Sequence, residues 1–405
     1  MSMRVVIAPD KFKGSLTAAE AARAMADGVL VAEPGAQVVL CPMADGGEGT
    51  VEAVLAATAG ELRQDVVSGP LPGQKVDARW ALLPAGTLAP FADSRQIEGF
   101  LAAGEATAVL EMAQASGFSL VPEGRRDPMA TSTIGTGELI LEALDAGCRQ
   151  VILGLGGSGT VDGGMGMATA LGYRFLDIDG SDLSPGGASL SRIDSIDTSG
   201  SDPRLSEARF LVASDVDNPL VGAQGAARVF GPQKGATTEQ VEALDTGLRL
   251  LGEAINGSLG IDVLEMPGAG AAGGLGAGLV AFCGAEIVSG VRLIASLTGL
   301  ANKVDGADLV LTGEGSFDSQ TARGKTPAGV VEVARERGVP VVVIAGRLAG
   351  DTDGSAVSGV ATYSILPGPM DLSEAMEEAA EILKTGTARL LRLLNLMPRH
   401  GRGPA

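Results

Sequence analysis

The feature that most constrains this chain is a series of short apolar runs, each followed by a polar loop and then a helical segment. Residues 4–8 (RVVIA) and 37–41 (QVVLC) are the first two runs. Nearly continuous apolar runs of this length are typical of strands in a parallel sheet with both faces covered. Thr17 and Glu20 match the capping box of a helix that we expect to run to about residue 32. This alternation predicts an α/β fold with a doubly wound sheet.

The pattern changes at residues 68–73 (SGPLPG), which carry two prolines and two glycines, and the following residues 74–83 alternate like an antiparallel strand. Apolar runs at 307–312 and 339–346 restore the first pattern near the C-terminus. We therefore predict two domains and a tail. The outer parallel-sheet α/β domain comprises 1–68 and 285–395, the inserted α/β domain comprises 69–284, and 396–405 form a flexible tail.

Composition excludes several classes of function. The formal net charge of −19 argues against a nucleic-acid binder and against an anionic membrane surface. The single histidine, His400, leaves catalytic triads and HExxH zinc sites without a plausible base. Cys41, Cys148 and Cys283 are too far apart for a CxxC motif and favour buried thiols in a cytoplasmic protein. No apolar stretch approaches the ~20 residues of a membrane span. A general acid or base is therefore expected to be Asp, Glu or Lys.

Two polar loops follow the N-terminal strands, and open α/β sheets bind ligands at such positions. The loop at 9–15 carries Asp10, Lys11 and Lys13 ahead of a helix, which suits an anion site, although a solvated turn explains it equally well. In the loop at 43–50, Asp45 and Glu48 flank two glycines. These carboxylates could hold a cation or orient a hydroxyl, or one of them could merely cap the next helix.

A third loop, residues 154–164 (GLGGSGTVDGG), contains a GxGxxG pattern directly after a strand, and Asp177 follows at a distance suited to a ribose. This pattern leaves an NAD(P)-dependent oxidoreductase open as an alternative. Glycines at 163, 164 and 166 disfavour the required helix, however, and 268–274 matches GxGxxG as well. The amides around Ser158 could instead hold a phosphate, with Asp162 near a metal.

The fourth loop, residues 312–326, ends in Gly-Lys-Thr and resembles a Walker A motif. That motif requires glycine at the position occupied by Ser319, so a P-loop nucleotidase is not supported. A dense charged cluster remains, which either contributes to a site or forms surface ion pairs: Glu314, Asp318, Arg323 and Lys325. Several glycine-rich loops with carboxylates and lysines in a nearly histidine-free chain fit phosphoryl transfer.

A run of ordered motifs now carries a resemblance. In chain order, these motifs are IAPDKFKGSLTA, PMADGGEGT, TSTIGTGELI, GLGGSGTVDGG, SDVDNPL, GAARVFGPQKGAT, PGAGAAGGLGAG and LTGEGSFDSQTARGKTP. The chain resembles the bacterial glycerate kinase family of glycerate and glyoxylate degradation, because it contains that family's motifs in the same order. The similarity extends from about residue 4 to about 390. It implies phosphorylation of D-glycerate with ATP and Mg²⁺, with 2-phosphoglycerate as the expected product and the 3-hydroxyl left open. It also implies one flavodoxin-like and one restriction-enzyme-like core.

Glycerate is a small anion with two hydroxyls, so its carboxylate needs a cation and its reacting hydroxyl needs a carboxylate partner. We assign catalytic roles to Asp45, Asp215, Lys11 and Lys325. Substrate or phosphate binding is assigned to Asp10, Lys13, Gly156, Gly157, Ser158, Asn218, Gly270, Gly273, Glu314 and Arg323. Metal binding is assigned to Asp162 and Asp318. The expected partner is a small molecule rather than nucleic acid or membrane, and assembly into a homo-oligomer stays open.

Overall fold

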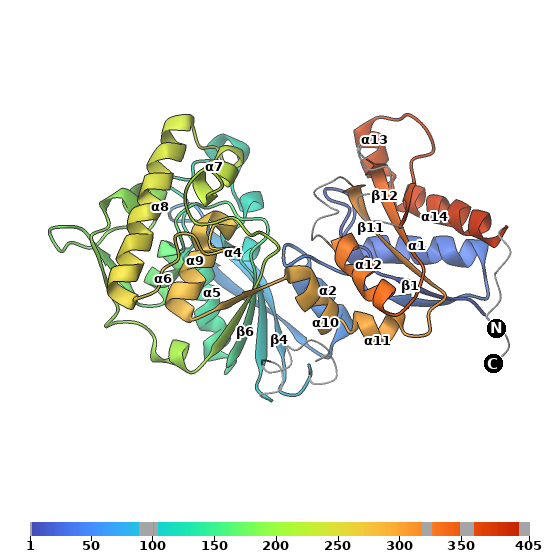
Figure 1. Cartoon of the computed structure of the whole chain (residues 1–405), viewed down its shortest axis with the longest axis horizontal. Coiled ribbons are helices and arrows are strands. Elements are labelled where there is room, and N and C mark those ends of the chain that lie inside the picture. The colour runs from blue at the N-terminus through green and yellow to red at the C-terminus, as the bar shows by residue number, and fades with distance from the viewer. Residues whose placement is uncertain (1, 89–99, 101–103, 318–325, 349–359, 397–405) are drawn as a thin grey trace. The chain divides into compact units, whose positions relative to one another are not determined.

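The chain divides by its internal contacts into two compact units (Figure 1). The structure, a computed structural model, describes residues 2–88, 100, 104–317, 326–348 and 360–396. Unit 1 comprises Met1–Ala44 and Ile294–Ala405, and unit 2 comprises Asp45–Leu293. Unit 1 is thus built from both ends of the chain, and unit 2 is one continuous segment.

Unit 1 contains a sheet in which every neighbouring pair of strands is parallel. In sheet order, its described strands are β13 (Ala361–Ser364), β12 (Val341–Leu348), β11 (Leu309–Phe317), β1 (Arg4–Ile7) and β2 (Gln37–Leu40). Counted along the chain, this order is 2-1-3-4-5, which is the flavodoxin-like doubly wound order. Strand order reverses beside β1, so ligands are expected at the carboxyl ends of β1 and β11.

Helices cover both faces of this sheet because successive residues of its strands point to opposite sides. The described helices are α1 (Ala18–Ala32), α11 (Leu300–Val304), α12 (Thr326–Glu336), α13 (Leu372–Glu377) and α14 (Ala379–Asn395). In β12, Val342 and Ile344 join a buried cluster with residues of α1 and α14. Val343 joins a separate cluster with Val331 of α12. The predicted capping box is confirmed, since Thr17 and Glu20 exchange side-chain and backbone hydrogen bonds at the start of α1.

Unit 2 contains a mixed sheet. In order, its described strands are β10 (Glu286–Val288), β9 (Arg209–Ala213), β6 (Gln150–Gly154), β5 (Thr107–Glu111), β4 (Lys75–Leu83) and β3 (Glu61–Ser68). The first four are mutually parallel, and β4 and β3 are antiparallel to their neighbours, as the alternation in 74–83 predicted. A separate pair consists of β7 (Arg174–Leu176) and β8 (Ser195–Asp197).

The residues at 68–73, which we had expected to mark a domain boundary, form the turn between β3 and β4. The amide of Gly69 donates to the carbonyl of Gln74 at 2.9 Å, and β3 pairs with β4 from Glu61 to Ser68. Proline and glycine suit a hairpin turn as well as a linker, so their presence does not separate the two cases. The compact units divide at 44/45 and 293/294, whereas the predicted domains divide at 68/69 and 284/285.

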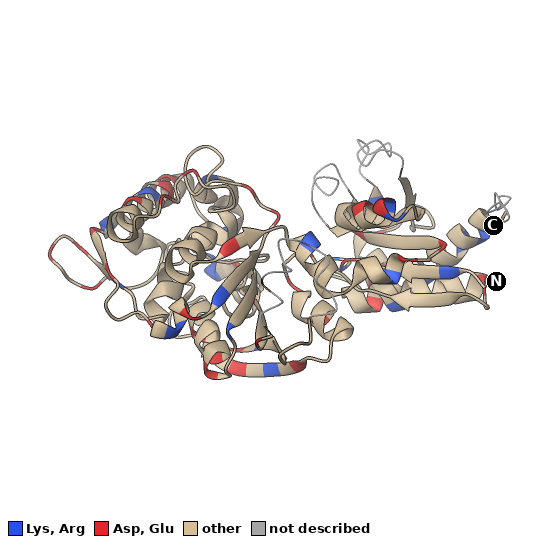
Figure 2. Cartoon of the chain, turned by 60° about the horizontal axis from the view of Figure 1, so that its bottom comes forward, with Lys and Arg blue, Asp and Glu red and all other residues tan. Residues whose placement is uncertain are grey.

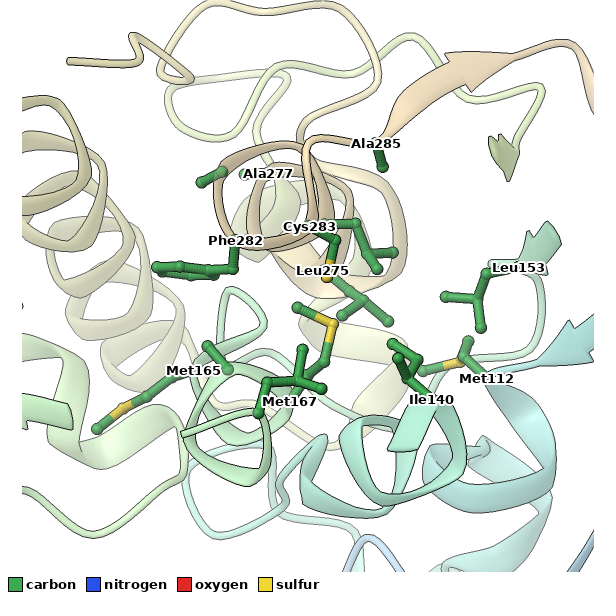
Figure 3. Close-up of a cluster of buried hydrophobic side chains, with 14 of the residues drawn as sticks. Met112, Ile140, Leu153, Met165, Met167, Leu275, Ala277, Phe282, Cys283 and Ala285 are labelled. Atoms are coloured by element: carbon green, nitrogen blue, oxygen red, sulfur yellow. The ribbon is translucent and has the colours of Figure 1, made fainter. Parts of the chain in front are cut away.

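The helices of unit 2 enclose its larger core. They are α2 (Thr50–Ala57), α4 (Ala113–Ser116), α5 (Ile134–Asp145), α6 (Met165–Ala170), α7 (Ala226–Phe230), α8 (Thr238–Leu259) and α9 (Ala271–Cys283). Short 3-10 turns are η2 (Phe118–Leu120), η3 (Glu123–Arg125), η4 (Gly187–Arg192), η5 (Pro203–Ser206) and η6 (Pro232–Lys234). Leu275 of α9, Met167 of α6 and Ile140 of α5 gather with Leu153 of β6 in one cluster (Figure 3). Helix α10 (Gly290–Leu297) contains the junction between the units.

Acidic and basic residues are interspersed along the chain (Figure 2). Many of the described basic side chains are paired with carboxylates, as in the contacts of Arg174 with Asp182 and of Arg228 with Glu242. Exposed pairs of this kind contribute little to stability. Across the described residues, no helix is long and apolar enough to cross a membrane.

Candidate functional site

The polar loops of unit 2 converge at one edge of its sheet. The carboxyl ends of β5, β6, β9 and β10 lie at this edge because the four strands are parallel. The chain segments that follow them include Gly156–Ser158, Asp215 and Gly290, and the loop that starts at Asp45 packs against them. Ligands of open α/β sheets bind at this end of the strands.

The loop after Ala44 is held by backbone packing that only glycine permits. A Cβ atom at Gly46 would lie 2.7 Å from the carbonyl oxygen of Ala213, and one at Gly154 would overlap the carbonyl of Gly46. The amide of Gly156 donates to the same carbonyl of Gly46 at 3.3 Å. These approaches fix Asp45, whose Oδ1 accepts from the amide of Gly47 at 3.1 Å and leaves Oδ2 outside this turn.

Asp215 follows β9 and faces the first turn of α10. Its Oδ1 accepts from the Ser289 hydroxyl at 2.8 Å and from the Gly290 amide at 3.0 Å, and its Oδ2 accepts from the Val291 amide at 3.2 Å. Partial withdrawal from water raises the pKa of Asp215 to about 6, and the negative charge of Asp45 adds to this, while the three hydrogen bonds oppose it. The residue keeps an exposed surface, so a ligand can reach it.

Gly290 lies between the backbone of Asp45 and the carboxylate of Asp215. A Cβ atom there would overlap the carbonyl of Asp45 and would lie 3.3 Å from Oδ2 of Asp215. Two acids at one sheet edge, one with a pKa near neutrality, can accept a proton from a hydroxyl or contribute oxygen ligands to a cation.

The glycine-rich loop after β6 is anchored on both sides of Ser158. The carbonyl of Gly157 accepts from the amide of Phe118 at 2.7 Å, and the amide of Gly159 donates to the carbonyl of Ser116 at 2.9 Å. Gly157 has φ +79° and is exposed, so the loop turns its backbone toward solvent at this point. Gly156, Gly157 and Ser158 therefore lie together in one rigid loop, as phosphate binding would require.

A buried lysine lies behind this loop. Lys234, in η6, donates to Oγ of Ser158 at 2.7 Å and to the carbonyl of Thr160 at 2.8 Å. Its side chain is almost fully buried. Burial lowers the pKa of Lys234 to about 7, and the negative charge of Asp162 partly opposes this.

Asp162, one of the predicted metal ligands, uses both oxygens within the fold. Its Oδ1 accepts from the Gly164 amide at 3.1 Å, and its Oδ2 accepts from the amides of Thr133 at 2.8 Å and Gly166 at 3.2 Å. The hydroxyl of Thr133 contacts both oxygens. The residue is fully buried, and burial raises its pKa. These contacts favour a structural role at the start of α6, because a carboxylate has about four lone-pair positions to offer.

The remaining glycines of the predicted binding set act through backbone packing. The amide of Gly270 donates to the carbonyl of Asn218 at 2.9 Å, and the side chain of Asn218 donates to the carbonyl of Gln224 at 2.7 Å. A Cβ atom at Gly273 would overlap the carbonyl of Thr160. These contacts explain the second GxGxxG pattern by packing of the α9 start against neighbouring loops.

In unit 1, Asp10 links three segments at the carboxyl ends of β1 and β11. Its amide donates to the carbonyl of Gly313 at 2.9 Å, its Oδ1 accepts from the Lys11 amide at 2.7 Å, and its Oδ2 accepts from the Thr326 hydroxyl at 2.6 Å. Asp10 is buried, and Lys11 is half-buried. Asp10 thus fixes the loop that carries the two lysines.

Lys13 and Glu314 lie near this position. Lys13 is exposed, and its amide would lie 3.4 Å from a Cβ atom at Gly315. Glu314 belongs to β11, where it pairs in register with Ala345, so the strand extends beyond the predicted end at residue 312. Asp318, Arg323 and Lys325 lie outside the described residues.

Sequence reasoning missed three residues of the unit 2 site: Lys234, Gly290 and Glu111. Glu111 ends β5, and its Oε1 accepts from the amides of Gly49 at 3.1 Å and Val51 at 2.7 Å, which fixes the start of α2. A charged residue at the end of an apolar run was a usable signal for Glu111. Lys234 and Gly290 carried no spacing that ties them to the other motifs.

The alternative of an NAD(P)-dependent oxidoreductase needs Asp177 to bind a ribose, but the structure gives this carboxylate other partners. Oδ1 of Asp177 accepts from the amides of Asp179 and Ser181, and its Oδ2 pairs with Arg192 at 2.7 Å. These contacts make Asp177 a turn residue beside β7, which lies outside the sheet that contains β6. Helix α6 also begins only at Met165, well after the GxGxxG pattern.

The fold and its loops define an α/β protein with glycine-rich loops at the carboxyl ends of parallel strands. The sequence profile of the glycerate kinase family matches residues 5–395. A glycerate kinase of Halalkalibacterium halodurans is 47% identical over 94% of this chain and 95% of its own length. A glycerate 2-kinase of Escherichia coli K12 is 46% identical over 93% and 94%, respectively.

A similar crystal structure, described as a glycerate kinase 2 from Salmonella typhimurium LT2, has a TM-score of 0.81 and 43% identity. The similarity covers 98% of this chain and 99% of that chain. The chain belongs to the glycerate kinase family and is a phosphotransferase.

Proposed function

We propose that the protein transfers the γ-phosphoryl group of ATP to the 2-hydroxyl of D-glycerate in the presence of Mg²⁺. The Escherichia coli relative, 46% identical, carries the name glycerate 2-kinase and supports the position of transfer. The structural observation that carries the proposal is the pair Asp45 and Asp215 at the sheet edge that also holds the glycine-rich loop. Transfer to the 3-hydroxyl is the second candidate and is distinguished by the product.

Asp215 is proposed as the proton acceptor. A general base works best when its pKa lies near the operating pH, and Asp215 has a pKa raised to about 6 by burial and by Asp45. Asp215 accepts the proton of the glycerate hydroxyl as that oxygen bonds to phosphorus and the bond from phosphorus to ADP breaks. Hydrogen bonds from Ser289 and the α10 amides hold the carboxylate in place.

The donor set fits Mg²⁺, which takes oxygen ligands and usually keeps waters and substrate phosphates in its shell. Asp45 would contribute a carboxylate oxygen, and its charge raises the pKa of Asp215, so a cation beside it would relieve repulsion. Among the described residues, no group of three or more His, Cys, Asp or Glu side chains is placed to hold a metal ion. When bound, Mg²⁺ neutralises charge on the transferring group. Asp318 is kept as a further candidate ligand.

Other residues of the chain are proposed to bind the anionic groups. The amides of Gly156–Ser158 suit a phosphate at the carboxyl end of β6. Lys11 and Lys325 are proposed as catalytic cations, and Lys13 and Arg323 as binding cations. We place the enzyme in the cytoplasm, where its free and buried thiols would remain reduced.

The assignment is tested by replacing Asp45 with Asn and measuring ADP release with D-glycerate and Mg²⁺. Loss of a metal ligand or of the field that tunes Asp215 should lower kcat by at least two orders of magnitude. Asp179→Asn, which removes an exposed acid of the same unit, is the control. A loss under about tenfold for Asp45→Asn would remove Asp45 from the catalytic set.

A further inference from the structure

Lys234 stands apart from the other lysines of the described chain because its side chain is withdrawn from water. Its two hydrogen bonds end on the glycine-rich loop, at Oγ of Ser158 and at the carbonyl of Thr160. A buried ammonium group costs free energy unless hydrogen bonds or an opposite charge compensate it, and both of its acceptors here are uncharged oxygens of the loop. The lysine therefore acts on the loop and not as half of an ordinary ion pair.

The main chain around Lys234 is fixed as firmly as the side chain. Gly235 has φ +98°, and a Cβ atom there would overlap the carbonyl of Arg126. The amide of Lys234 donates to the carbonyl of Gly231 at 3.0 Å, which closes the 3-10 turn. The ammonium group is thus presented to the loop from a rigid turn.

The chemistry of this contact orients the serine hydroxyl. An ammonium group has donors only, so the Ser158 oxygen accepts from Lys234 and the hydroxyl proton is directed elsewhere. Ser158 is half-buried beside the exposed Gly157, and no residue of the described chain accepts that proton. The proton therefore faces the open side of the loop.

Further donors lie at the same place. Within the described residues, no carbonyl accepts from the amides of Gly157 or Ser158. The Glu48 carboxylate also lies beside this loop, with its Oε1 3.3 Å from the Cβ position of Gly157. Three donors on a rigid loop with an ammonium group behind them suit an anionic oxygen, and a carboxylate at the rim suits a cation that accompanies the anion.

We propose that Lys234 is a positioning residue that holds Ser158 as a hydrogen-bond donor to an anionic oxygen of a substrate. This inference rests on the proposed function for the reaction itself. The anionic oxygen could belong to a phosphate of the nucleotide or to the carboxylate of the hydroxy acid. The experiment separates the two by whether the KM for ATP or the KM for D-glycerate changes.

The test compares Lys234→Met, Ser158→Ala, Ser158→Thr and the double variant Lys234→Met/Ser158→Ala, with the exposed Lys75→Met as control. KM and kcat are measured separately for ATP and for D-glycerate. We expect both single variants to raise the KM for the same substrate by about 10- to 100-fold, the loss expected for a hydrogen bond to a charged group. The double variant should raise the KM no further than the single variant with the larger effect. Ser158→Thr keeps a hydroxyl group and should therefore have a KM close to that of the wild type.

The dependence of KM on pH separates this positioning role from a purely structural one, because a purely structural role would leave that dependence unchanged. As the pH rises through about 7, Lys234 loses its proton and the amine becomes an acceptor for the Ser158 hydroxyl. Asp162 is the charged group whose field acts on Lys234, and Arg126 packs beside its neighbour Gly235. KM for the responding substrate should therefore rise above about pH 7 in the wild type and stay flat in Ser158→Ala.

A thermal-shift assay with ATP and with D-glycerate, each alone, keeps the inference independent of turnover. If the wild type gives no phosphorylated product but one ligand still stabilises it and not Ser158→Ala, the proposed function fails and the inference stands. Wild-type turnover with Ser158→Ala kinetics within twofold of normal contradicts the inference, as does strict additivity in the double variant. No stabilisation of the wild type by either ligand also contradicts it. If Lys234→Met fails to fold by circular dichroism, the Ser158 variants decide.

Discussion

Asp45 and Asp215 of the unit 2 site differ in what surrounds them. Asp45 accepts a hydrogen bond from one amide in its own turn, whereas Asp215 accepts three hydrogen bonds at the start of α10. Partial desolvation and the nearby charge of Asp45 both act on Asp215. Desolvation and a like charge both disfavour ionisation, so the pKa of Asp215 lies above its ordinary value. These different surroundings suit the two proposed roles, Asp215 as the proton acceptor and Asp45 as a cation ligand.

The raised pKa of Asp215 predicts the acid side of the pH profile. Below about pH 6 the carboxyl group is protonated and cannot accept a proton, so kcat/KM for D-glycerate should fall as the pH is lowered through about 6. Asp215→Asn should lower kcat by at least two orders of magnitude at every pH and abolish this limb. A wild-type profile that stays flat from pH 7 down to pH 5 would contradict the assignment.

At the scale of elements, close backbone approaches set the positions of the loops. Gly46, Gly154 and Gly156 bring the loop after Ala44 against the carboxyl ends of β6 and β9. A side chain at any of these positions would separate the loops and move Asp45. These glycines therefore contribute to the site because they have no Cβ atom, which lets the backbones of the loops approach closely.

We expect Gly154→Ala to displace the Gly46 carbonyl, because the new Cβ atom would overlap it. The variant should lose at least a hundredfold in kcat/KM and about 1–3 kcal/mol of stability. Gly257→Ala in α8 is the matched control, since no atom lies within 4 Å of its Cβ position. That substitution should stabilise the protein by about 0.5–1 kcal/mol with unchanged activity. Thermal unfolding and steady-state kinetics measure both, and equal effects of the two changes would contradict the packing argument.

The sequence predicted the positions of single strands and helices better than their ends and their pairing. The apolar runs at 4–8, 37–41 and 339–346 coincide with strands of the structure, and the capping box of α1 is present. Residues 68–73, where the sequence predicts a boundary, form the turn between β3 and β4, because their composition suits a linker and a hairpin alike. Likewise β11 continues to Phe317, since pairing with β12 carries it through residues with low strand propensity.

The candidate site was predictable only in part, because contacts between distant parts of the chain cannot be read from local sequence patterns. Acidic and glycine residues directly after apolar runs pointed to Asp45, Asp215 and Ser158. The role of Lys234 could not be foreseen, because it depends on a contact between residues 76 positions apart along the chain. Asp162 lies in a motif typical of a ligand, and its hydrogen bonds, which the sequence does not show, favour a structural role.

At the scale of the whole molecule, unit 2 is one continuous segment with its own large core, whereas unit 1 needs both ends of the chain. A continuous segment with a complete core can fold without the rest of the protein. The parallel sheet of unit 1 joins β1 near the N-terminus to β11 near the C-terminus, so unit 1 cannot form from either end alone.

We therefore expect the segment Asp45–Leu293, expressed alone, to fold cooperatively. Circular dichroism and urea unfolding would show a single transition, and dispersed amide signals in an NMR spectrum would show native packing. The segment Ile294–Ala405 alone is the comparison and should lack a cooperative transition. An unfolded Asp45–Leu293 segment would contradict the independence of this unit.

The most direct test of the central claim is ³¹P NMR of the intact protein with ATP, Mg²⁺ and D-glycerate. The proposed reaction predicts a phosphomonoester signal that grows with ADP and is split into a doublet by the single proton on carbon 2. A triplet would move the transfer to the 3-hydroxyl and leave the kinase assignment in place. A verified folded sample that forms no phosphomonoester would contradict the account.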